Sequence, residues 1–280
     1  MITHIKNIIP DQKGIGAFNT FNQEITRAIL AASAKTKKAL IIQVTEKSLK
    51  YGGVEALSNL INKTAEEFGG CRAAIHLDHG KDLSIIKKCL KLGFSSVHFD
   101  GSELPFKKNI AITKKVVAMA KRHKAWVQGE VGVIAGQEGA LKSKRAKLAK
   151  EYFTNPKLAR DYVRQTMVNT LAVSVGSLHG EFKGKEKLDF PRIREIKKAV
   201  GRTPLVLHGG SGVSQAELKK AIKSGMTIFN LDTTLRIAFV DTLKKDLKKN
   251  PEIIDPRFFL ERARLAIEKE VIKYLKTFNQ

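Results

Sequence analysis

Eight short, apolar, β-rich runs recur along the chain, and their alternation with helical stretches constrains the fold more than any other feature. The stretches between the runs carry apolar residues at helical spacing, such as Ile25, Ile29 and Leu30. Each is long enough for the crossover that parallel strands require. Eight consecutive β-then-α units predict a (β/α)8 TIM barrel of the α/β class. The runs span residues 16–19, 39–44, 73–78, 95–100, 126–131, 170–176, 204–209 and 226–231.

The length of the chain fits one large domain. At 280 residues, we expect a single barrel domain over residues 1–280, with a C-terminal helical extension after the eighth run. An open doubly wound sheet is the alternative, but no G-x-G-x-x-G follows the first run. No run approaches the roughly 18 apolar residues of a membrane span. Two cysteines, Cys71 and Cys89, are too few for a disulfide framework, so we expect a cytoplasmic protein.

The formal net charge of +24 is the most unusual bulk property. A field this positive attracts phosphates, nucleic acids and anionic membranes. The basic residues, however, form short groups at helix-like positions, which indicates solvated helix faces rather than one basic stripe. Only 7% of residues are aromatic, whereas nucleic-acid surfaces interleave aromatic and basic side chains. We therefore expect neither a specific nucleic-acid partner nor a membrane partner.

Three histidines follow the ends of predicted strands. His79, His179 and His208 stand at the ends of the third, sixth and seventh runs, and in a TIM barrel these ends share one mouth. A lone histidine is usually a core or surface residue, but three such placements coincide here. Three neutral imidazoles around Zn²⁺ leave a fourth position open, as a Lewis-acid site requires. The pattern predicts a catalytic zinc site.

Glycines beside these histidines suggest a second role. Such residues let backbone N–H groups approach an anion closely, although many glycine-rich turns only reverse the chain direction and bind no ligand. A lysine and two hydroxyls nearby could complete a phosphate pocket. The candidate residues are Gly180, Lys183, Gly209, Gly210, Ser211 and Thr233.

With these motifs in this order, the chain resembles the class II, zinc-dependent fructose-bisphosphate aldolase family, which includes tagatose-bisphosphate aldolases. The resemblance extends along nearly the whole chain. Its most specific pieces are His76-Leu77-Asp78-His79-Gly80, Asp100-Gly101-Ser102, His179-Gly180-Glu181-Phe182-Lys183 and Leu207-His208-Gly209-Gly210-Ser211-Gly212.

The resemblance implies one catalytic Zn²⁺ held by His79, His179 and His208. It implies that Asp78 takes the proton from the C4 hydroxyl as the C3–C4 bond breaks. Glu138 matches the glutamate that returns a proton to the enediolate. Glu138 lies in residues 136–152, which we expect to form a long loop that closes over the site.

Further roles follow from the same resemblance. Asp100 and Glu130 match a second metal position, which leaves room for a second metal or a monovalent cation. Their alternative role is to orient the histidines. Arg257 matches an arginine that reaches a distal phosphate, often from a neighbouring subunit, so a homodimer or homotetramer is implied. The phosphorylated sugar is expected to contact Asn19, Thr45, Gly180, Lys183, Gly209, Gly210, Ser211, Asn230, Asp232 and Thr233.

Several positions depart from the family pattern. Gln128 stands where a glutamate is usual, Gly139 where an aspartate is usual, and Ile228 where a lysine is common. Thr45 replaces a serine. We interpret His98, two residues before Asp100, as core packing, with metal contact as the alternative.

The implied activity is reversible cleavage of fructose 1,6-bisphosphate to dihydroxyacetone phosphate and glyceraldehyde 3-phosphate. Tagatose bisphosphate differs at one stereocentre and is the alternative substrate. A Schiff-base aldolase would need a nucleophilic lysine, and no strand-end lysine stands out. The third hypothesis is a non-catalytic protein that binds acidic partners through its basic surface.

Overall fold

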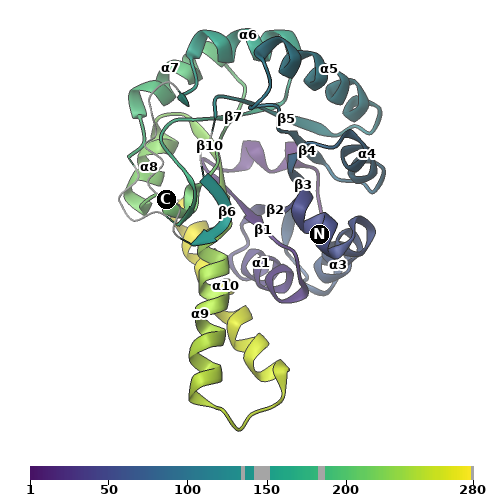
Figure 1. Ribbon diagram of the computed structural model, residues 1–280, viewed down its shortest axis with the longest axis vertical. Coiled ribbons are helices and arrows are strands. Elements are labelled where there is room, and N and C mark those ends of the chain that lie inside the picture. The colour runs from purple at the N-terminus through teal and green to yellow at the C-terminus, as the bar shows by residue number, and fades with distance from the viewer. Residues whose placement is uncertain (134–135, 142–151, 182–186, 279–280) are drawn as a thin grey trace.

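Eight parallel strands close into a barrel at the centre of the molecule (Figure 1). The computed structural model describes residues 1–133, 136–141, 152–181 and 187–278. Around the barrel the strands follow the order β1-β10-β9-β7-β5-β4-β3-β2, and β2 pairs with β1 to close it. The barrel strands are β1 (Ile15–Asn19), β2 (Ala39–Thr45), β3 (Arg72–Gly80), β4 (Ser96–Phe99), β5 (Trp126–Val131), β7 (Thr170–Val173), β9 (Leu205–Leu207) and β10 (Met226–Leu231).

Helices surround the barrel (Figure 1), as the predicted β-then-α alternation requires. Helix α4 illustrates why they form: Asp82 caps its first turn by accepting from the N–H of Ser84, and its buried residues lie on one face. The helices are α1 (Gln23–Thr36), α2 (Glu46–Gly52), α3 (Val54–Glu67), α4 (Leu83–Lys91), α5 (Phe106–Arg122), α6 (Pro156–Thr166), α7 (Phe190–Val200), α8 (Gln215–Lys223), α9 (Thr233–Lys249) and α10 (Pro256–Phe278).

The barrel interior contains its own small core. Two short 3-10 helices, η1 (Ile5–Asn7) and η2 (Ile9–Asp11), precede β1. Ile5 and Ile8 are buried against inward-facing residues of six strands and so close one end of the barrel. The polar site must therefore lie at the other end. The strand residues in this inner core are Ile15, Ala17, Ala39, Ile41, Ala74, Ala172, Val206 and Ile228.

One sequence expectation needs correction. Residues 136–152 were expected to form a loop, but Gly136–Leu141 is a strand, β6, which pairs with β8 (His179–Glu181) in a separate two-stranded parallel sheet. Pairing along one edge thus accounts for the strand conformation of this segment. Residues 142–151 lie outside the described part of the chain. The pairing brings the segment that bears Glu138 beside the segment that bears His179.

The predicted C-terminal extension is present and has a specific shape. Helices α9 and α10 form an antiparallel hairpin that projects from the barrel as an arm (Figure 1). Toward its C-terminus α10 returns to the barrel and packs against α1 and α8. The arm carries five exposed large apolar residues, namely Val240, Leu247, Ile254, Phe258 and Leu265.

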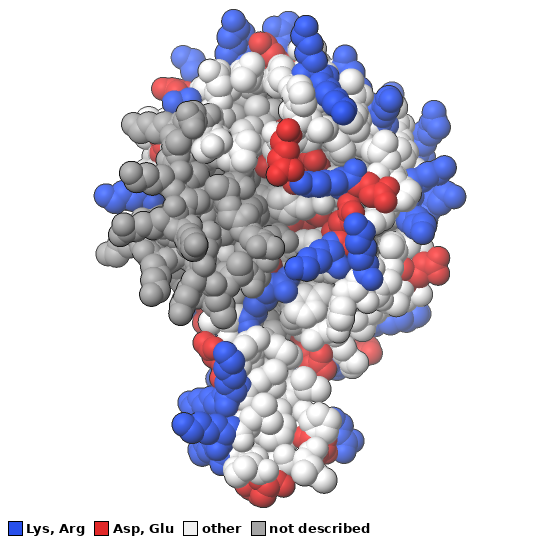
Figure 2. Space-filling view, in the orientation of Figure 1, with Lys and Arg blue, Asp and Glu red and all other residues white. Residues whose placement is uncertain are grey.

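Charged side chains are spread over the described part of the face drawn in Figure 2. Figure 2 shows Lys and Arg side chains around the rim and on the arm, with acidic side chains between them. On this face the basic residues thus follow helix surfaces, as the sequence grouping predicted. Within the described residues, no helix is long and apolar enough to cross a membrane.

Candidate active site

Several of the predicted site residues meet at the open end of the barrel, because the carboxyl ends of parallel strands share that end. Strand β3 ends in Asp78 and His79, His208 follows β9, and Asn230 lies in β10. These residues come from distant parts of the sequence, yet their side chains contact one another.

His79 has an unusual backbone conformation. Its φ of 48° lies in the left-handed region, which non-glycine residues seldom adopt. Its N–H donates to Nδ1 of His98 at 3.2 Å. Its own Nδ1 lies 2.9 Å from Oδ2 of Asp100, and since a carboxylate only accepts, the ring proton is on Nδ1. The Nε2 atom of His79 then carries a lone pair, and it faces His208.

His208 faces His79. Nδ1 of His208 lies 2.9 Å from Nε2 of His79, and the ring centroids are 4.6 Å apart. Gly209 lets the chain just after His208 pass close to Leu178, because at its φ of 68° a Cβ would overlap the carbonyl oxygen of Leu178. The same contact brings the backbone before His179 next to His208. The His179 side chain itself lies outside the described part of the structure.

The donor atoms fit a metal ion. Ligand atoms of Asp78, His79 and His208 all lie within 4.8 Å of one another. Two nitrogen ligands on one tetrahedral Zn²⁺ lie about 3.3 Å apart, since each bond is about 2.0 Å long. The 2.9 Å between the two imidazole nitrogens is close to that separation. Neutral imidazoles are also the ligand type that Zn²⁺ accepts readily.

Asp78 is a buried carboxylate with several amide donors. Only 1% of it is exposed. Oδ2 accepts from Asn19 and from Gln43, each at 3.2 Å, and Oδ1 accepts from Asn230 at 3.3 Å. Burial raises the pKa of Asp78, but nearby histidines, His79 first, outweigh burial and hold that pKa well below its usual range. Asp78 is therefore ionised, the state that a proton acceptor must start from.

Asp100 and Glu130 occupy different environments. Asp100 contacts Nδ1 of His79, which is how a carboxylate orients a metal-binding histidine. Burial raises the pKa of Asp100, but the hydrogen bond with His79 and nearby charges lower it overall. Glu130 is buried in β5, and its Oε2 lies 3.3 Å from Nε2 of His98 without hydrogen-bond alignment.

His98 is buried, as its interpretation as core packing requires, but that interpretation is incomplete. The side chain lies within the site, since it accepts from the N–H of His79 and faces Asp78 and Glu130. Burial lowers the pKa of His98, yet these two carboxylates outweigh burial and raise it. His79, His98 and Glu130 form a second group whose donor atoms could hold a metal.

A small cavity beside the histidines collects the predicted substrate residues. Ser211 shapes one wall, where its Oγ accepts from the backbone N–H groups of Asp232 and Thr234 at 3.2 and 3.3 Å. Helix α9 begins at Thr233, so the positive end of its dipole faces the cavity, as anion sites favour. The lining residues are Asn19, Gly180, Gly209, Ser211, Asn230, Asp232 and Thr233.

Asp232 is held by an ion pair with Arg236, whose Nε lies 2.7 and 2.8 Å from its two carboxylate oxygens. Burial raises the pKa of Asp232, and Arg236 opposes that effect. The guanidinium of Arg236 also lies 4.7 Å from the ring centroid of Phe21. These contacts fix the end of β10 where α9 begins.

Three other predicted substrate residues are not among those that line this cavity. Gly210 begins the short 3-10 helix η4 (Gly210–Gly212) next to it. Thr45 caps α2 by accepting from the N–H of Ser48 at 3.1 Å. Arg257 is exposed on the arm and pairs with Asp255. Lys183 and the side chain of Glu138 lie outside the described residues.

Sequence reasoning did not identify Gln43, which lies in β2 and donates both to Asp78 and to Asn19. The available signal was a polar residue inside an otherwise apolar run, Ala39-Leu40-Ile41-Ile42-Gln43-Val44. Such a residue is buried only where it finds hydrogen-bond partners.

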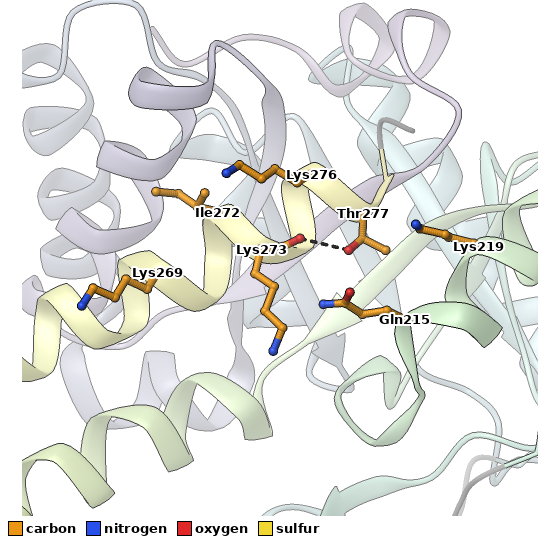
Figure 3. A pocket seen from close by; sticks show the side chains of 7 residues that line it. All are labelled: Gln215, Lys219, Lys269, Ile272, Lys273, Lys276 and Thr277. Carbon is orange, nitrogen blue, oxygen red and sulfur yellow. Dashed lines mark hydrogen bonds between the residues drawn. The ribbon is translucent and has the colours of Figure 1, made fainter.

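A larger hollow of about 340 Å³ lies between α8 and α10, away from the barrel mouth. Four lysines line it, but their side chains point in different directions (Figure 3). No shared anion position is visible among the residues drawn. This hollow is a basic helix surface and not part of the site. The lysines are Lys219, Lys269, Lys273 and Lys276.

A closed parallel barrel with a histidine pair and a buried acid at its mouth has the architecture of a TIM-barrel enzyme. The sequence profile of "Fructose-bisphosphate aldolase class-II" matches residues 3–280. The chain belongs to the class II fructose-bisphosphate aldolase family.

Individual relatives agree with this assignment. A fructose-bisphosphate aldolase of Thermus caldophilus is 39% identical over 93% of this chain and 90% of its own length. A probable fructose-bisphosphate aldolase of Bacillus subtilis (strain 168) is 36% identical over 95% of this chain and 92% of its own. The crystal structure of the YdjI aldolase from Escherichia coli K12 superimposes with a TM-score of 0.85 at 26% identity, covering 99% of this chain and 97% of that one.

Proposed function

We propose that the protein reversibly cleaves fructose 1,6-bisphosphate to dihydroxyacetone phosphate and glyceraldehyde 3-phosphate with the help of Zn²⁺. The observation that carries the proposal is the arrangement of Asp78 beside the facing pair His79 and His208. A proton acceptor and a pair of metal-type ligands within one buried site are what metal-assisted aldol cleavage needs. The family and the names of the relatives support the same activity.

His79, His179 and His208 would hold the ion. When bound, Zn²⁺ would polarise the ketone carbonyl of the substrate as a Lewis acid. Asp100 keeps the proton of His79 on Nδ1 and so would leave the lone pair of Nε2 available to the ion. Glu130, with His98 beside it, supports a second cation position deeper in the barrel.

Asp78 would remove the proton from the C4 hydroxyl, and the electrons of the C3–C4 bond would remain with the ketone half. Its low pKa keeps it ionised before the reaction. Asn19, Gln43 and Asn230 hold the carboxylate in place through their amide groups. Glu138 would then return a proton to C3, a role supported by its place in β6 beside β8.

The cavity beside α9 would bind the phosphate of the dihydroxyacetone half. Backbone N–H groups at Gly180 and Gly209, the hydroxyls of Ser211 and Thr233, and the dipole of α9 all favour a phosphate there. Lys183 would add a positive charge. With the phosphate fixed, C4 of the substrate extends toward Asp78 and the far end toward Thr45.

We also propose that the chain forms a homo-oligomer, as a dimer or tetramer, through the arm. Five large apolar residues on one helical hairpin form an exposed surface of the kind that marks protein contacts. Arg257 lies near the turn of this hairpin, and its side chain is 88% exposed. It would reach the distal phosphate of the substrate that is bound in a neighbouring subunit. We further propose that residues 1–280 act as one domain in the cytoplasm.

Side-by-side coupled assays on fructose and tagatose bisphosphates, with and without a chelator, test the proposal. Cleavage of the fructose substrate that stops on chelation and returns with Zn²⁺ supports it. The names of the relatives favour fructose over tagatose. If the protein shows no turnover and still binds acidic partners after replacement of His208, the non-catalytic alternative is supported instead.

A further inference from the structure

We propose that Gln128 is the positioning residue of His208 and that its neutral amide, in place of a carboxylate, weakens the hold of the site on its cation. The inference rests on the proposed metal function of His79 and His208 and concerns how these ligands are tuned. Gln128 lies in β5 and is 3% exposed. It is not one of the residues that line the cavity proposed for the substrate phosphate.

Gln128 contacts one nitrogen of the His208 ring, while the other nitrogen faces His79. Nε2 of Gln128 lies 3.0 Å from Nε2 of His208, whereas Nδ1 of His208 lies 2.9 Å from Nε2 of His79. The amide of Asn230 also approaches Nε2 of His208, at 3.4 Å, but it donates to Asp78 at 3.3 Å. Gln128 is therefore the nearer partner of that nitrogen.

Two arrangements of protons satisfy these contacts when the rings are neutral. Asp100 accepts from Nδ1 of His79, so Nε2 of His79 carries a lone pair. In the first arrangement, Nδ1–H of His208 donates to that lone pair, and Nε2 of His208 accepts from the amide of Gln128. In this tautomer Nδ1 of His208 has no lone pair for a cation.

In the second arrangement, the proton of His208 is on Nε2, and both Nδ1 of His208 and Nε2 of His79 direct lone pairs to a shared cation. The amide of Gln128 must then turn over so that Oε1 accepts from Nε2–H. Amide nitrogen and oxygen exchange places at little steric cost. Gln128 therefore supports both tautomers, including the one that cannot bind the cation.

A carboxylate at position 128 would accept only, so it would support the binding tautomer alone. Asp100 already does this for His79. An apparent dissociation constant rises as the competent fraction of a protein falls, and a carboxylate partner also makes a histidine ligand more basic. The two histidines are thus held unequally, His79 by a charged group and His208 by a neutral one.

The experiment measures Zn²⁺ affinity by competition with a chromogenic chelator for the parent and the variants Gln128→Glu and Gln128→Met. We expect Gln128→Glu to tighten binding about tenfold or more, and Gln128→Met, which keeps the volume but loses the contact, to weaken it about 10- to 100-fold. Gln43→Glu is the matched control, because Gln43 is equally buried and near Asp78 and does not make the Gln128 contact with His208. It should tighten binding clearly less. Equal tightening by Gln43→Glu, or unchanged affinity in Gln128→Met, would overturn the inference.

A second readout follows the tautomer itself. ¹⁵N NMR of the chelated protein should show His208 with a substantial Nδ1-protonated population in the parent and mainly Nε2-protonated in Gln128→Glu. An unchanged tautomer in Gln128→Glu would contradict the mechanism. Thermal melts of the chelated variants show whether each variant folds. If Gln128→Glu does not fold, the Zn²⁺ affinity of Gln128→Met still tests the inference. If the parent protein binds Zn²⁺ and cleaves the substrate but its Zn²⁺ affinity does not change with the residue at position 128, this inference alone is refuted. If the parent protein does not bind Zn²⁺, the proposed function is refuted.

Discussion

Oδ2 of Asp100 accepts a hydrogen bond from Nδ1 of His79 across 2.9 Å, and this contact turns the other ring nitrogen toward His208. Replacement Asp100→Asn removes the charge that orients the ring. Zn²⁺ affinity should fall about 10- to 100-fold in a chelator competition assay. Glu103→Gln removes a carboxylate from an exposed pair with Lys81 and serves as the control. Equal affinity in the two variants would show that the contact does not orient the ligand.

Asp78→Asn should abolish most turnover without releasing the metal. The substitution keeps the shape but removes the proton acceptor, so kcat should fall by at least about 10²-fold, the lower end of general-base effects. Bound Zn²⁺ per chain, measured by metal analysis, should stay within error of the parent value. Substantial turnover in this variant would mean that another group takes the C4 proton.

Ser211→Ala should raise the KM for fructose bisphosphate more than it lowers kcat. Ser211 lines the cavity, and a hydrogen bond to a charged group contributes about 1.5–3 kcal/mol, or roughly 10- to 100-fold in affinity. Inhibition by inorganic phosphate should weaken in parallel. Ser214→Ala, which removes the cap of α8 outside the cavity, should leave the KM near the parent value. A KM that is insensitive to Ser211 would place the phosphate elsewhere.

Leu247→Glu should dissociate the oligomer. Leu247 is 52% exposed on α9, and a charge buried in an apolar contact should raise the dissociation constant about tenfold or more. Light scattering after size exclusion measures the mass. Lys248→Glu introduces a glutamate at the adjacent position without removing an apolar side chain, so it should change the mass of the oligomer less. A parent protein that is monomeric at all concentrations would disprove assembly through the arm.

The stability of the chelated protein should decrease as pH falls below about 6.5. Burial lowers the pKa of His76 to about 3. Between these values the unfolded chain binds a proton at His76 that the folded chain does not. Folding therefore weakens by about 1 kcal/mol from pH 6.5 to 5.5, and the slope approaches about 1.4 kcal/mol per pH unit at lower pH. Denaturant unfolding at pH 6.5 and 5.5 measures the slope.

His76→Gln should flatten that slope, whereas the same change at the exposed His123 should not. The window is distinct from those of neighbouring groups. The lowered pKa values of Asp78 and Asp100 affect stability only at more acidic pH, and the raised pKa of His98 affects it above about pH 6.5. An unaltered slope in His76→Gln would mean that His76 is not kept neutral by burial.

The barrel could be predicted from sequence because its strands are apolar runs with β-rich composition, a pattern that depends only on local residues. The ends of those runs also placed Asp78, His79 and His208 at one mouth, since parallel topology brings strand ends together. Small differences remain at the ends, where β7 stops at Val173 and β9 spans only Leu205–Leu207.

Other features depend on contacts that a linear pattern does not carry. Strand β6 has no apolar alternation of its own and forms by pairing with β8. The environment of His98 depends on its register beside Gln128 and on the left-handed conformation of His79. Resemblance indicated that Gln128 is unusual, but only the contact with His208 gives that difference a physical role.

The most direct measurement is a Zn²⁺ titration of chelated protein, followed by turnover of fructose 1,6-bisphosphate. Turnover should rise with added Zn²⁺ until one catalytic ion per chain is bound, and His208→Ala should show neither tight binding nor turnover. Turnover that persists in full after chelation, together with borohydride trapping of the substrate on a lysine, would contradict a metal site at the barrel mouth.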